Sequence, residues 1–387
     1  MTDIDTSDRC SFDHLLDDDE RVVLRTVREF MANERALKVA PRLRGLSDAT
    51  NTCRGYGTGC GSSLLDGLIN MEIARTDAST AIFNNTHSGL AMRSIRLFGS
   101  DYQRSRFLPE MTAYTSRGSF AMPAMGSDET SGDTLGLVAE LVGNGVWLLN
   151  GEARCVGGVE PATIRIVWAW DRTGRELNGF VVHEDLDGIR WAVPAALDRG
   201  NSADDLGAIF HNVEVLEENR LPLANRWSHA RQVIDTNWVA IEWMAIGCAS
   251  GAYAAALRHS RDTEFSRRDS IERAMVQDSL NVMGANLSAA ISRCRRMSAL
   301  LETGATAGVQ SSTASADRLG WMKETVELGV RVVGTVNPPQ RNEMNKFTVD
   351  SDRIALFAAS LAVDAPCPRR RWRARPLREA ALIRRSR

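Results

Sequence analysis

The stretch WLLNGEARCVGG (Trp147–Gly158) indicates a β region in the middle of a chain whose flanks are helical. The run at 146–149 is rich in β-branched and aromatic side chains, and turn signals flank it at Asn144-Gly145 and Asn150-Gly151. Similar short runs recur at Ile164–Trp170, Gly179–Val182 and Ala208–Val215, separated by turn signals at Thr173-Gly174 and Asp187-Gly188. The pattern predicts a small β domain over residues 119–225.

Helical patterns lie on both sides of this β block. In DDDERVVLRTVREFMANE (Asp17–Glu34) the apolar side chains recur at helical spacing, and acidic residues crowd the N-terminal end, where the helix dipole favours them. Leu64–Arg75 and Leu90–Phe98 repeat the pattern before the β block. After it, we expect helices at Gln232–His259, Ile271–Leu301 and Ala314–Val333.

The predicted fold class is therefore α+β, in four segments. We expect an N-terminal α-helical domain at 12–118, a middle β domain at 119–225, a C-terminal four-helix bundle at 228–362 and a basic tail at 363–387. The tail is expected to be solvated, because runs of like charge repel one another and stay in water.

Composition excludes several classes of function. The 387 residues are 43% hydrophobic and 25% charged, the balance of an ordinary soluble protein, and the net charge of −2 gives no reason to expect a nucleic-acid partner. The acidic N-terminus and the lack of a long apolar run predict a cytoplasmic protein with no membrane partner. The seven scattered cysteines show neither metal-ligand spacing nor a disulfide framework, so no metal site is expected. The preference for Arg over Lys is typical of a GC-rich bacterial genome.

Several ordered words resemble the acyl-CoA dehydrogenase family. FGSDYQRSRFLPEM (Phe98–Met111) is similar to the segment that precedes the family's β domain, and FHNVEVLEENRLP (Phe210–Pro222) is similar to a word near the end of that domain. WLLNGEARCVGG stands where the family has a "W.lnG.K.wItn" word. IEWMAIG (Ile241–Gly247) and the GYG loop look most like the glutaryl-CoA dehydrogenase branch. The similarity covers residues 12–362 and implies the fold predicted above.

The resemblance implies FAD-dependent α,β-dehydrogenation of an acyl thioester, carried by CoA or by a carrier protein. In the family a glutamate removes the α-proton while flavin N5 takes the β-hydride. The backbone N–H of that glutamate and a flavin hydroxyl bond to the thioester carbonyl and stabilise the charge that develops on it. FAD is therefore the cofactor that the family leads us to expect.

The catalytic glutamate is missing. Aligned on the family's "YEGT" word, the run Arg331–Ser360 places Phe357 on the tyrosine and Ala358 on the base, and an alanine methyl accepts no proton. Only the backbone N–H of Ala358 remains to meet the thioester carbonyl. Some members carry the base on the first helix of the last domain, but the matching position here is near Asn237, which is not a carboxylate.

Two other residues are candidates for the base. Glu242 lies five residues after Asn237, about 140° further round the same helix, where a hydrogen-bonded core acid is the alternative interpretation. His87 lies in FNNTHSGLAM, a segment that lines the acyl pocket in the family, and a satisfied core histidine is the alternative there. The same segment adds Asn85 to the candidate substrate pocket. Ala81 stands where the glutaryl branch has its carboxylate-binding arginine, so a dicarboxylyl substrate is not expected.

The flavin-binding words are also eroded. In AMPAMGSD (Ala121–Asp128) Gly126 and Ser127 can be placed, but the family's Thr-Glu pair is missing and Met122 is the remaining contact candidate. The "WIT" word, whose Trp and Thr pack on the flavin, is replaced by Cys155, Val156 and Gly157. The pyrophosphate motif is reduced to Arg261 and Phe265 at altered spacing, and Gly334 keeps one glycine of a "GG" word. We therefore expect FAD to be weakly held or lost.

Three interpretations stay open at this point. The protein is an acyl-thioester enzyme with a relocated base, a non-redox lyase, isomerase or non-catalytic partner subunit on the same scaffold, or a decayed gene product. In the first two, the resemblance implies a homodimer or homotetramer formed through the C-terminal helices, with pairing to an active paralogue as the alternative. The apolar circumference of Ile241–Leu257 favours burial in such an interface.

Overall fold

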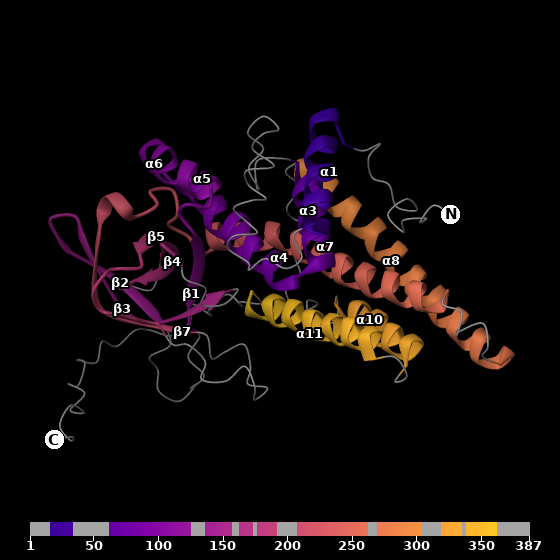
Figure 1. The fold of residues 1–387 in the computed structure, drawn as a ribbon. Helices are drawn as coiled ribbons and strands as arrows, with labels where there is room; N and C mark the ends of the chain where they lie inside the picture. Colours follow the sequence, from indigo (N-terminus) through magenta and orange to yellow (C-terminus); the bar gives the residue numbers. More distant parts are fainter. Residues whose placement is uncertain are drawn as a thin grey trace, which may run out of the picture.

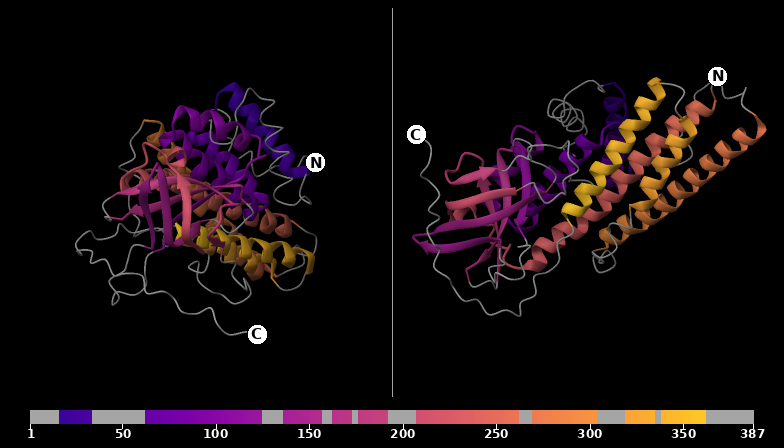
Figure 2. Two further views of the ribbon diagram at one scale, coloured as in Figure 1. Left: turned by 90° about the vertical axis from the view of Figure 1, so that its left-hand side faces the viewer. Right: turned by 90° about the horizontal axis from the view of Figure 1, so that it is seen from below.

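The computed structural model describes residues 16–33, 62–124, 136–156, 162–172, 176–191, 207–261, 269–303, 319–334 and 338–361. Within these ranges a helical part, a β part and a second helical part follow one another along the chain. Figures 1 and 2 show the β part at one end of an elongated molecule, with the long C-terminal helices extending away from it. The predicted α+β arrangement is confirmed, while the domain limits given above stay predictions.

The N-terminal helices are bounded by side-chain caps. Ser62 caps α3 by accepting a hydrogen bond from the Leu65 N–H at 3.1 Å, and Ser100 and Gln103 form a reciprocal capping box at the start of α6. The elements are α1 (Asp18–Asn33), α3 (Ser63–Thr76), α4 (Ala78–Asn84), η3 (Asn85–Met92), α5 (Arg93–Phe98) and α6 (Asp101–Thr112).

The helix expected at Leu90–Phe98 begins earlier than its pattern indicates. Helical structure runs without a break from Ala78, and Asp77 caps it by accepting hydrogen bonds from the backbone N–H groups of Ser79 and Thr80. The sequence pattern fails here because Asn84, Asn85 and Thr86 are poor helix formers. The segment is held in a helix by its surroundings, since all three side chains are buried.

The β part is a mixed sheet that closes on itself. Its order is β1-β4-β2-β3-β7-β6, with β5 paired to β4, and an additional pairing of β1 with β3 completes a ring of four strands around an apolar core. Closure leaves these four strands without a free edge. The strands are β1 (Gly118–Pro123), β2 (Leu137–Gly143), β3 (Val146–Val156), β4 (Ile164–Asp171), β5 (Leu177–His183), β6 (Ile189–Trp191) and β7 (Gly207–Leu216).

One of the two asparagine-glycine signals is a turn and the other is not. Asn144 and Gly145 join β2 to β3 with positive φ values of 51° and 72°, as a tight hairpin requires. Gly151, with φ of 117°, lies inside β3 at a shift of register against β7. The expected turn at Asn150-Gly151 is therefore a β-bulge, a second structure that a glycine of positive φ permits. Thr173-Gly174 lies outside the described residues.

The C-terminal part is a bundle of four long helices: α7 (Trp227–Ser260), α8 (Ser270–Glu302), α10 (Gly320–Val333) and α11 (Pro338–Ser360). Part of the helix expected from Ala314 lies outside the described residues. α7 is long and apolar enough to cross a membrane, but 83% of its apolar window is buried within the protein. Its circumference is covered by α3, α8, α10 and α11, so its apolar character reflects a central position in the protomer and not the expected subunit interface.

α3 and α7 pack in register at every fourth residue. A Cβ at Gly67 would lie closer than 3.0 Å to the Trp243 indole, and a Cβ at Gly247 would lie equally close to the Met71 carbonyl. One turn further on, Gly251 faces the Arg75 carbonyl at 2.9 Å from its ideal Cβ position. Glycine is required at these points because a methyl group would push the two helix backbones apart.

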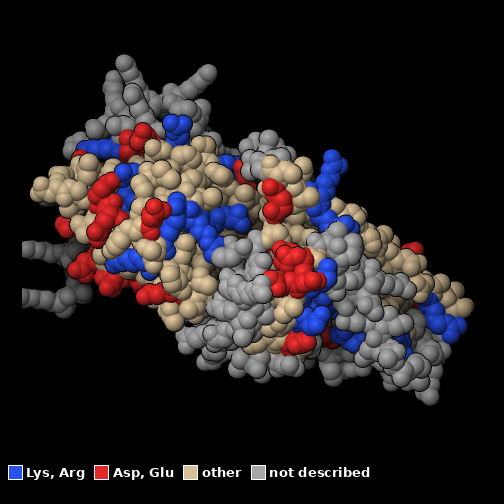
Figure 3. Space-filling view, turned by 90° about the horizontal axis from the view of Figure 1, so that it is seen from above, with Lys and Arg blue, Asp and Glu red and all other residues tan. Residues whose placement is uncertain are grey.

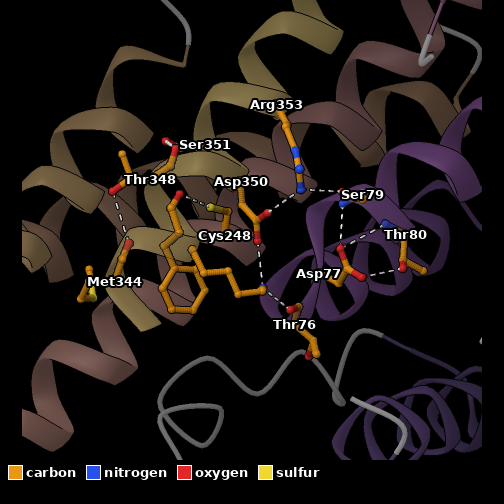
Figure 4. Close-up of polar contacts among 12 residues, drawn as sticks. Thr76, Asp77, Ser79, Thr80, Cys248, Met344, Thr348, Asp350, Ser351 and Arg353 are labelled. Atoms are coloured by element: carbon orange, nitrogen blue, oxygen red, sulfur yellow. Dashed lines mark hydrogen bonds and ion pairs between the residues drawn. The ribbon is translucent and has the colours of Figure 1, made fainter. Parts of the chain in front are cut away.

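α11 is fixed to the junction of α3 and α4 by charged side chains (Figure 4). Asp350, only 2% exposed, pairs with Lys346 at 2.9 Å and with Arg353 at 3.7 Å. Lys346 also donates to the Thr76 carbonyl, and Arg353 donates to the Ser79 hydroxyl at 2.9 Å. These contacts place α11 beside the start of the segment that continues into η3.

We predict that Gly247→Ala destabilises the protein by about 1–3 kcal/mol, the usual cost of inserting a methyl group where a backbone cannot move away. The matched control is Gly284→Ala in the middle of α8, where the nearest atom to the new methyl is the Tyr253 hydroxyl oxygen at 3.8 Å. There the gain in helix propensity should stabilise by up to about 1 kcal/mol. Urea denaturation measures both changes, and an unchanged midpoint for Gly247→Ala contradicts the packing described above.

Candidate functional site

The candidate site lies where η3 packs between α7 and β1. η3 is a π-helical stretch inside the continuous helix that runs from α4 to α5. π-Helical turns are rare and often accompany functional positions, because they widen the helix and redirect its side chains. Here the stretch carries a row of buried polar side chains, which are Asn85, Thr86, His87 and Ser88.

Asparagine amides join η3 to α7 and α4 to α3. The Asn237 amide nitrogen donates to the Asn85 amide oxygen at 2.7 Å, and both side chains are at most 2% exposed. On the neighbouring turn, Asn84 donates to Asn70 at 3.2 Å and accepts a hydrogen bond from the Tyr114 hydroxyl. The structure thus brings the predicted pocket residue Asn85 against Asn237, the position of the alternative base.

His87 is a buried structural histidine. Its Nδ1 accepts the backbone N–H of Gly118 at 2.8 Å, so Nε2 carries the proton and donates to the Met111 carbonyl at 2.9 Å. Burial lowers the pKa of His87 from 6.5 to about 4. With both ring nitrogens engaged in fixing α6 and β1 to η3, His87 has no nitrogen directed at a substrate proton, which agrees with the alternative interpretation of a satisfied core histidine.

Glu242 points to a different part of the fold. Its Oε2 accepts hydrogen bonds from Arg293 Nε at 3.0 Å and from the Cys294 thiol at 3.4 Å, both on α8, and its side chain is 1% exposed. Asn237, five residues earlier on α7, faces η3 instead. The 140° offset therefore separates the two side chains, and Glu242 has the contacts of a core acid that pairs α7 with α8.

Ala358 is buried near the end of α11, with 3% exposure. The helix continues to Ser360, and each N–H beyond the first helical turn donates to the carbonyl four residues before it. The backbone N–H expected to meet a thioester carbonyl is thus used within the helix. The Ser360 hydroxyl turns back to the Phe357 carbonyl at 2.7 Å, so this segment presents no described acid or base of its own.

Ala81 and Phe357, the remaining predicted pocket residues, are buried in the main apolar core together with Ala358. Ala81 is in α4, which packs against α11, the helix that carries the other two. The surroundings of these three positions are thus apolar, unlike those of Asn85 and Asn237.

The flavin positions are described only in part. Gly126, Ser127, Gly157 and Phe265 lie outside the described residues. Arg261 is exposed at the C-terminal end of α7, and Gly334 ends α10 with φ of 68°. Met122 and Cys155 lie on the paired strands β1 and β3, and both side chains are buried in apolar clusters, where burial raises the pKa of the Cys155 thiol to about 11.

These described positions do not fit a flavin as the family holds it. Neither Met122 nor Cys155 supplies a stacking indole or a hydroxyl group, and both side chains are already packed within the protein. No catalytic step through FAD follows from the described residues.

Two features of the candidate site were not predicted from the sequence. The contact of Asn237 with Asn85 joins residues 152 positions apart, and Gly89 faces this amide pair from η3. A usable signal was present in the run Asn84-Asn85-Thr86, since consecutive polar residues in an otherwise apolar helix face indicate a buried polar network.

Comparisons with known proteins agree with this fold. The family model described as "Acyl-CoA dehydrogenase, N-terminal domain" matches residues 49–115. An acyl-CoA dehydrogenase of Bacillus subtilis is 26% identical over 214 residues, covering 54% of each chain. A short-chain-specific acyl-CoA dehydrogenase of Megasphaera elsdenii is 25% identical over 196 residues, covering 49% of this chain and 50% of that one. Together these matches support the acyl-CoA dehydrogenase family for this chain.

Solved structures of this family share the fold along most of the chain. Glutaryl-CoA dehydrogenase from Mycobacterium smegmatis superposes with a TM-score of 0.71 at 19% identity, covering 91% of this chain and 96% of that one. Butyryl-CoA dehydrogenase from Megasphaera elsdenii gives 0.72 at 18% identity, covering 89% and 95%. In sequence, by contrast, the match spans about half the length of the curated relatives.

The surface of the protein carries charges of both signs. On the face shown in Figure 3, the described acidic and basic side chains are interspersed and do not form one basic surface. This distribution gives no electrostatic preference for a polyanion on that face.

We predict that His87 makes stability depend on pH between about 4 and 6.5. Because its folded pKa lies below 6.5, the unfolded state binds more protons in this range, so the stabilisation is complete above pH 6.5 and is lost as pH falls towards 4. A lowering from 6.5 to about 4 corresponds to about 3 kcal/mol. In denaturation series at several pH values, the gap between the wild type and His87→Gln should shrink towards pH 4. The same change at the exposed His211 is the control for the substitution itself. A constant gap for His87→Gln contradicts the prediction.

Proposed function

We propose that the protein binds an acyl thioester on the acyl-CoA dehydrogenase scaffold and does not catalyse ordinary FAD-dependent α,β-dehydrogenation. The burial of Ala358 inside α11, with its N–H used by the helix, is the observation that carries the proposal. Among the described residues, the other candidate bases are Glu242, bound to Arg293, and His87, whose ring nitrogens are both engaged. Membership of the family supports the choice of an acyl thioester as ligand.

Binding is tested by titrating the purified chain with octanoyl-CoA and with free CoA as the matched control. We expect octanoyl-CoA to bind more tightly than free CoA, because burial of apolar acyl carbons is favourable by about 0.8 kcal/mol of free energy for each CH₂. Equal affinities for CoA and acyl-CoA, together with no binding of an acyl carrier protein thioester, would refute the proposal.

We predict that dehydrogenation of octanoyl-, isobutyryl- or glutaryl-CoA is slower than in an ordinary family member by a factor of at least about 10²–10⁴, the usual contribution of a general base. We also expect FAD to be weakly held, because the ring contacts at Met122 and Cys155 are lost. An absorption spectrum after gel filtration and an assay with an artificial electron acceptor measure both. Stoichiometric FAD with normal turnover would show that another residue is the base.

A second role, as a partner subunit, is favoured by an apolar row on α8. Ile271, Met275 and Val282 are 69%, 66% and 36% exposed, and their spacing of four and seven residues places them on one face of the helix. Such a row is typical of a helix that packs against another chain. We infer that α8, and not the buried α7, forms the contact with a second copy or with an active paralogue.

This assembly is tested by Ile271→Glu combined with Met275→Glu. Light scattering should show a homodimer or homotetramer for the wild type and a smaller particle for the double variant, because charges are costly to bury in an apolar contact. Leu141→Glu is the control, since Leu141 is 54% exposed on β2, far along the chain from α8. A monomeric wild type at micromolar concentration contradicts the inference for a second copy.

A further inference from the structure

A small cavity lies beside the amide pair of Asn85 and Asn237. It opens between α3, η3 and α7 and has a volume of about 30 Å³, room for one or two water-sized groups. Its lining is polar on the η3 side and includes Asn70, Asn84, Asn85, Ser88, Gly89 and Asn237. The cavity thus offers hydrogen-bonding groups, next to the apolar side chains of Ile69 and Ala240.

Asn237 leaves one of its polar atoms unused at this cavity. Its nitrogen is bonded to Asn85 at 2.7 Å, while its Oδ1 is buried and has no hydrogen-bond partner in the protein. A buried polar atom without a partner is unfavourable, because it has given up its hydrogen bonds to water. A hydroxyl group both donates and accepts, so it satisfies the Asn237 amide in either orientation of the side chain.

The charges around the cavity favour a neutral group. Asp66 and Arg93, which also line it, pair with each other at 3.8 Å, so neither sign of charge dominates. The remaining polar groups of the lining are uncharged amides and hydroxyls. A carboxylate or an ammonium group would have to be desolvated without a free counter-charge, whereas a hydroxyl needs only hydrogen bonds.

Gly89 allows the Asn237 amide oxygen to pack closely against the backbone of η3. A Cβ at this position would lie closer than 3.0 Å to Asn237 Oδ1 and 3.2 Å from Asn85 Nδ2. Any larger residue would therefore place a carbon atom against the unpartnered oxygen of Asn237. Gly89 and the unpartnered oxygen of Asn237 together form one wall of the recess.

We propose that this recess receives the hydroxyl group of a hydroxyacyl chain, so that the acyl thioester bound by this protein is a hydroxyacyl thioester. The proposal rests on the function proposed above and names its substrate class. Asn237 and Gly89 are then the residues that distinguish a hydroxylated acyl chain from a plain saturated one.

The test compares matched pairs of ligands on the full chain. Butyryl-CoA is titrated against 4-hydroxybutyryl-CoA, and hexanoyl-CoA against 6-hydroxyhexanoyl-CoA, by calorimetry. For at least one length we expect the hydroxyacyl form to bind about tenfold more tightly, equivalent to about 1.4 kcal/mol. This comparison uses the wild type alone and does not depend on the folding of a variant.

Asn237→Leu keeps the approximate shape of the side chain and removes its hydrogen bonds, so the ratio of hydroxyacyl to plain acyl affinity should fall to about one. Asn281→Leu, the same change at an exposed position on α8, should keep the preference. Equal affinities for both ligands of each pair in the wild type show that the recess holds water only and overturn the proposal. A preference that survives Asn237→Leu also overturns it. If no acyl-CoA binds at all, the proposed function itself fails.

Discussion

The close contact of α3 with α7 is the constraint on which the rest of the helical structure depends. Three pairs in register, Gly67 with Trp243, Met71 with Gly247 and Arg75 with Gly251, bring the two backbones together at every fourth residue. The Trp243 indole also donates to Ser298 on α8 at 3.1 Å, so one side chain ties three helices to each other. Because the seam fixes α7 relative to α3, it also fixes what α7 presents to η3.

That geometry sorts the polar side chains of α7 into separate environments. Asn237 contacts η3, while Glu242 contacts Arg293 on α8. Only a rotation of the whole helix would exchange these contacts. Glu242 is thus held away from the amide-lined recess. A carboxylate this deeply buried is tolerated because its cationic partner, Arg293, stays close.

Two of the described flavin positions and the base position are parts of the apolar core. Met122, Cys155 and Ala358 are all buried among hydrophobic side chains, where they contribute packing. Meanwhile the π-helical stretch retains a polar interior, with Asn85 and His87 fully hydrogen-bonded or paired to neighbouring elements. Polar networks of this kind are costly to bury and are kept where each member has a partner. The unpartnered oxygen of Asn237 is the exception, and this exception marks the recess.

The sequence by itself determined the order of the helical and β parts, because hydrophobic periodicity is local and differs between the two kinds of structure. It also determined that Ala358 stands at the expected base position, since a residue's identity needs no folding to be known. It did not determine the helix from Ala78 or the bulge at Gly151. In the helix from Ala78, burial outweighs weak helix propensity. In the bulge, the Asn150-Gly151 dipeptide, which is typical of a turn, lies inside a strand that pairs with β7.

Only the tertiary structure decided which polar residues meet. Asn85 lies in η3 and Asn237 in α7, and the orientation of each depends on the π-helical turn and on the seam between α3 and α7. Likewise, α7 looked like an interface helix in sequence, because apolar residues around a helix indicate burial without saying by what. The fold covers α7 with its own chain and leaves the apolar row of α8 exposed instead. Contacts between residues distant in sequence arise from packing, and local patterns carry no record of them.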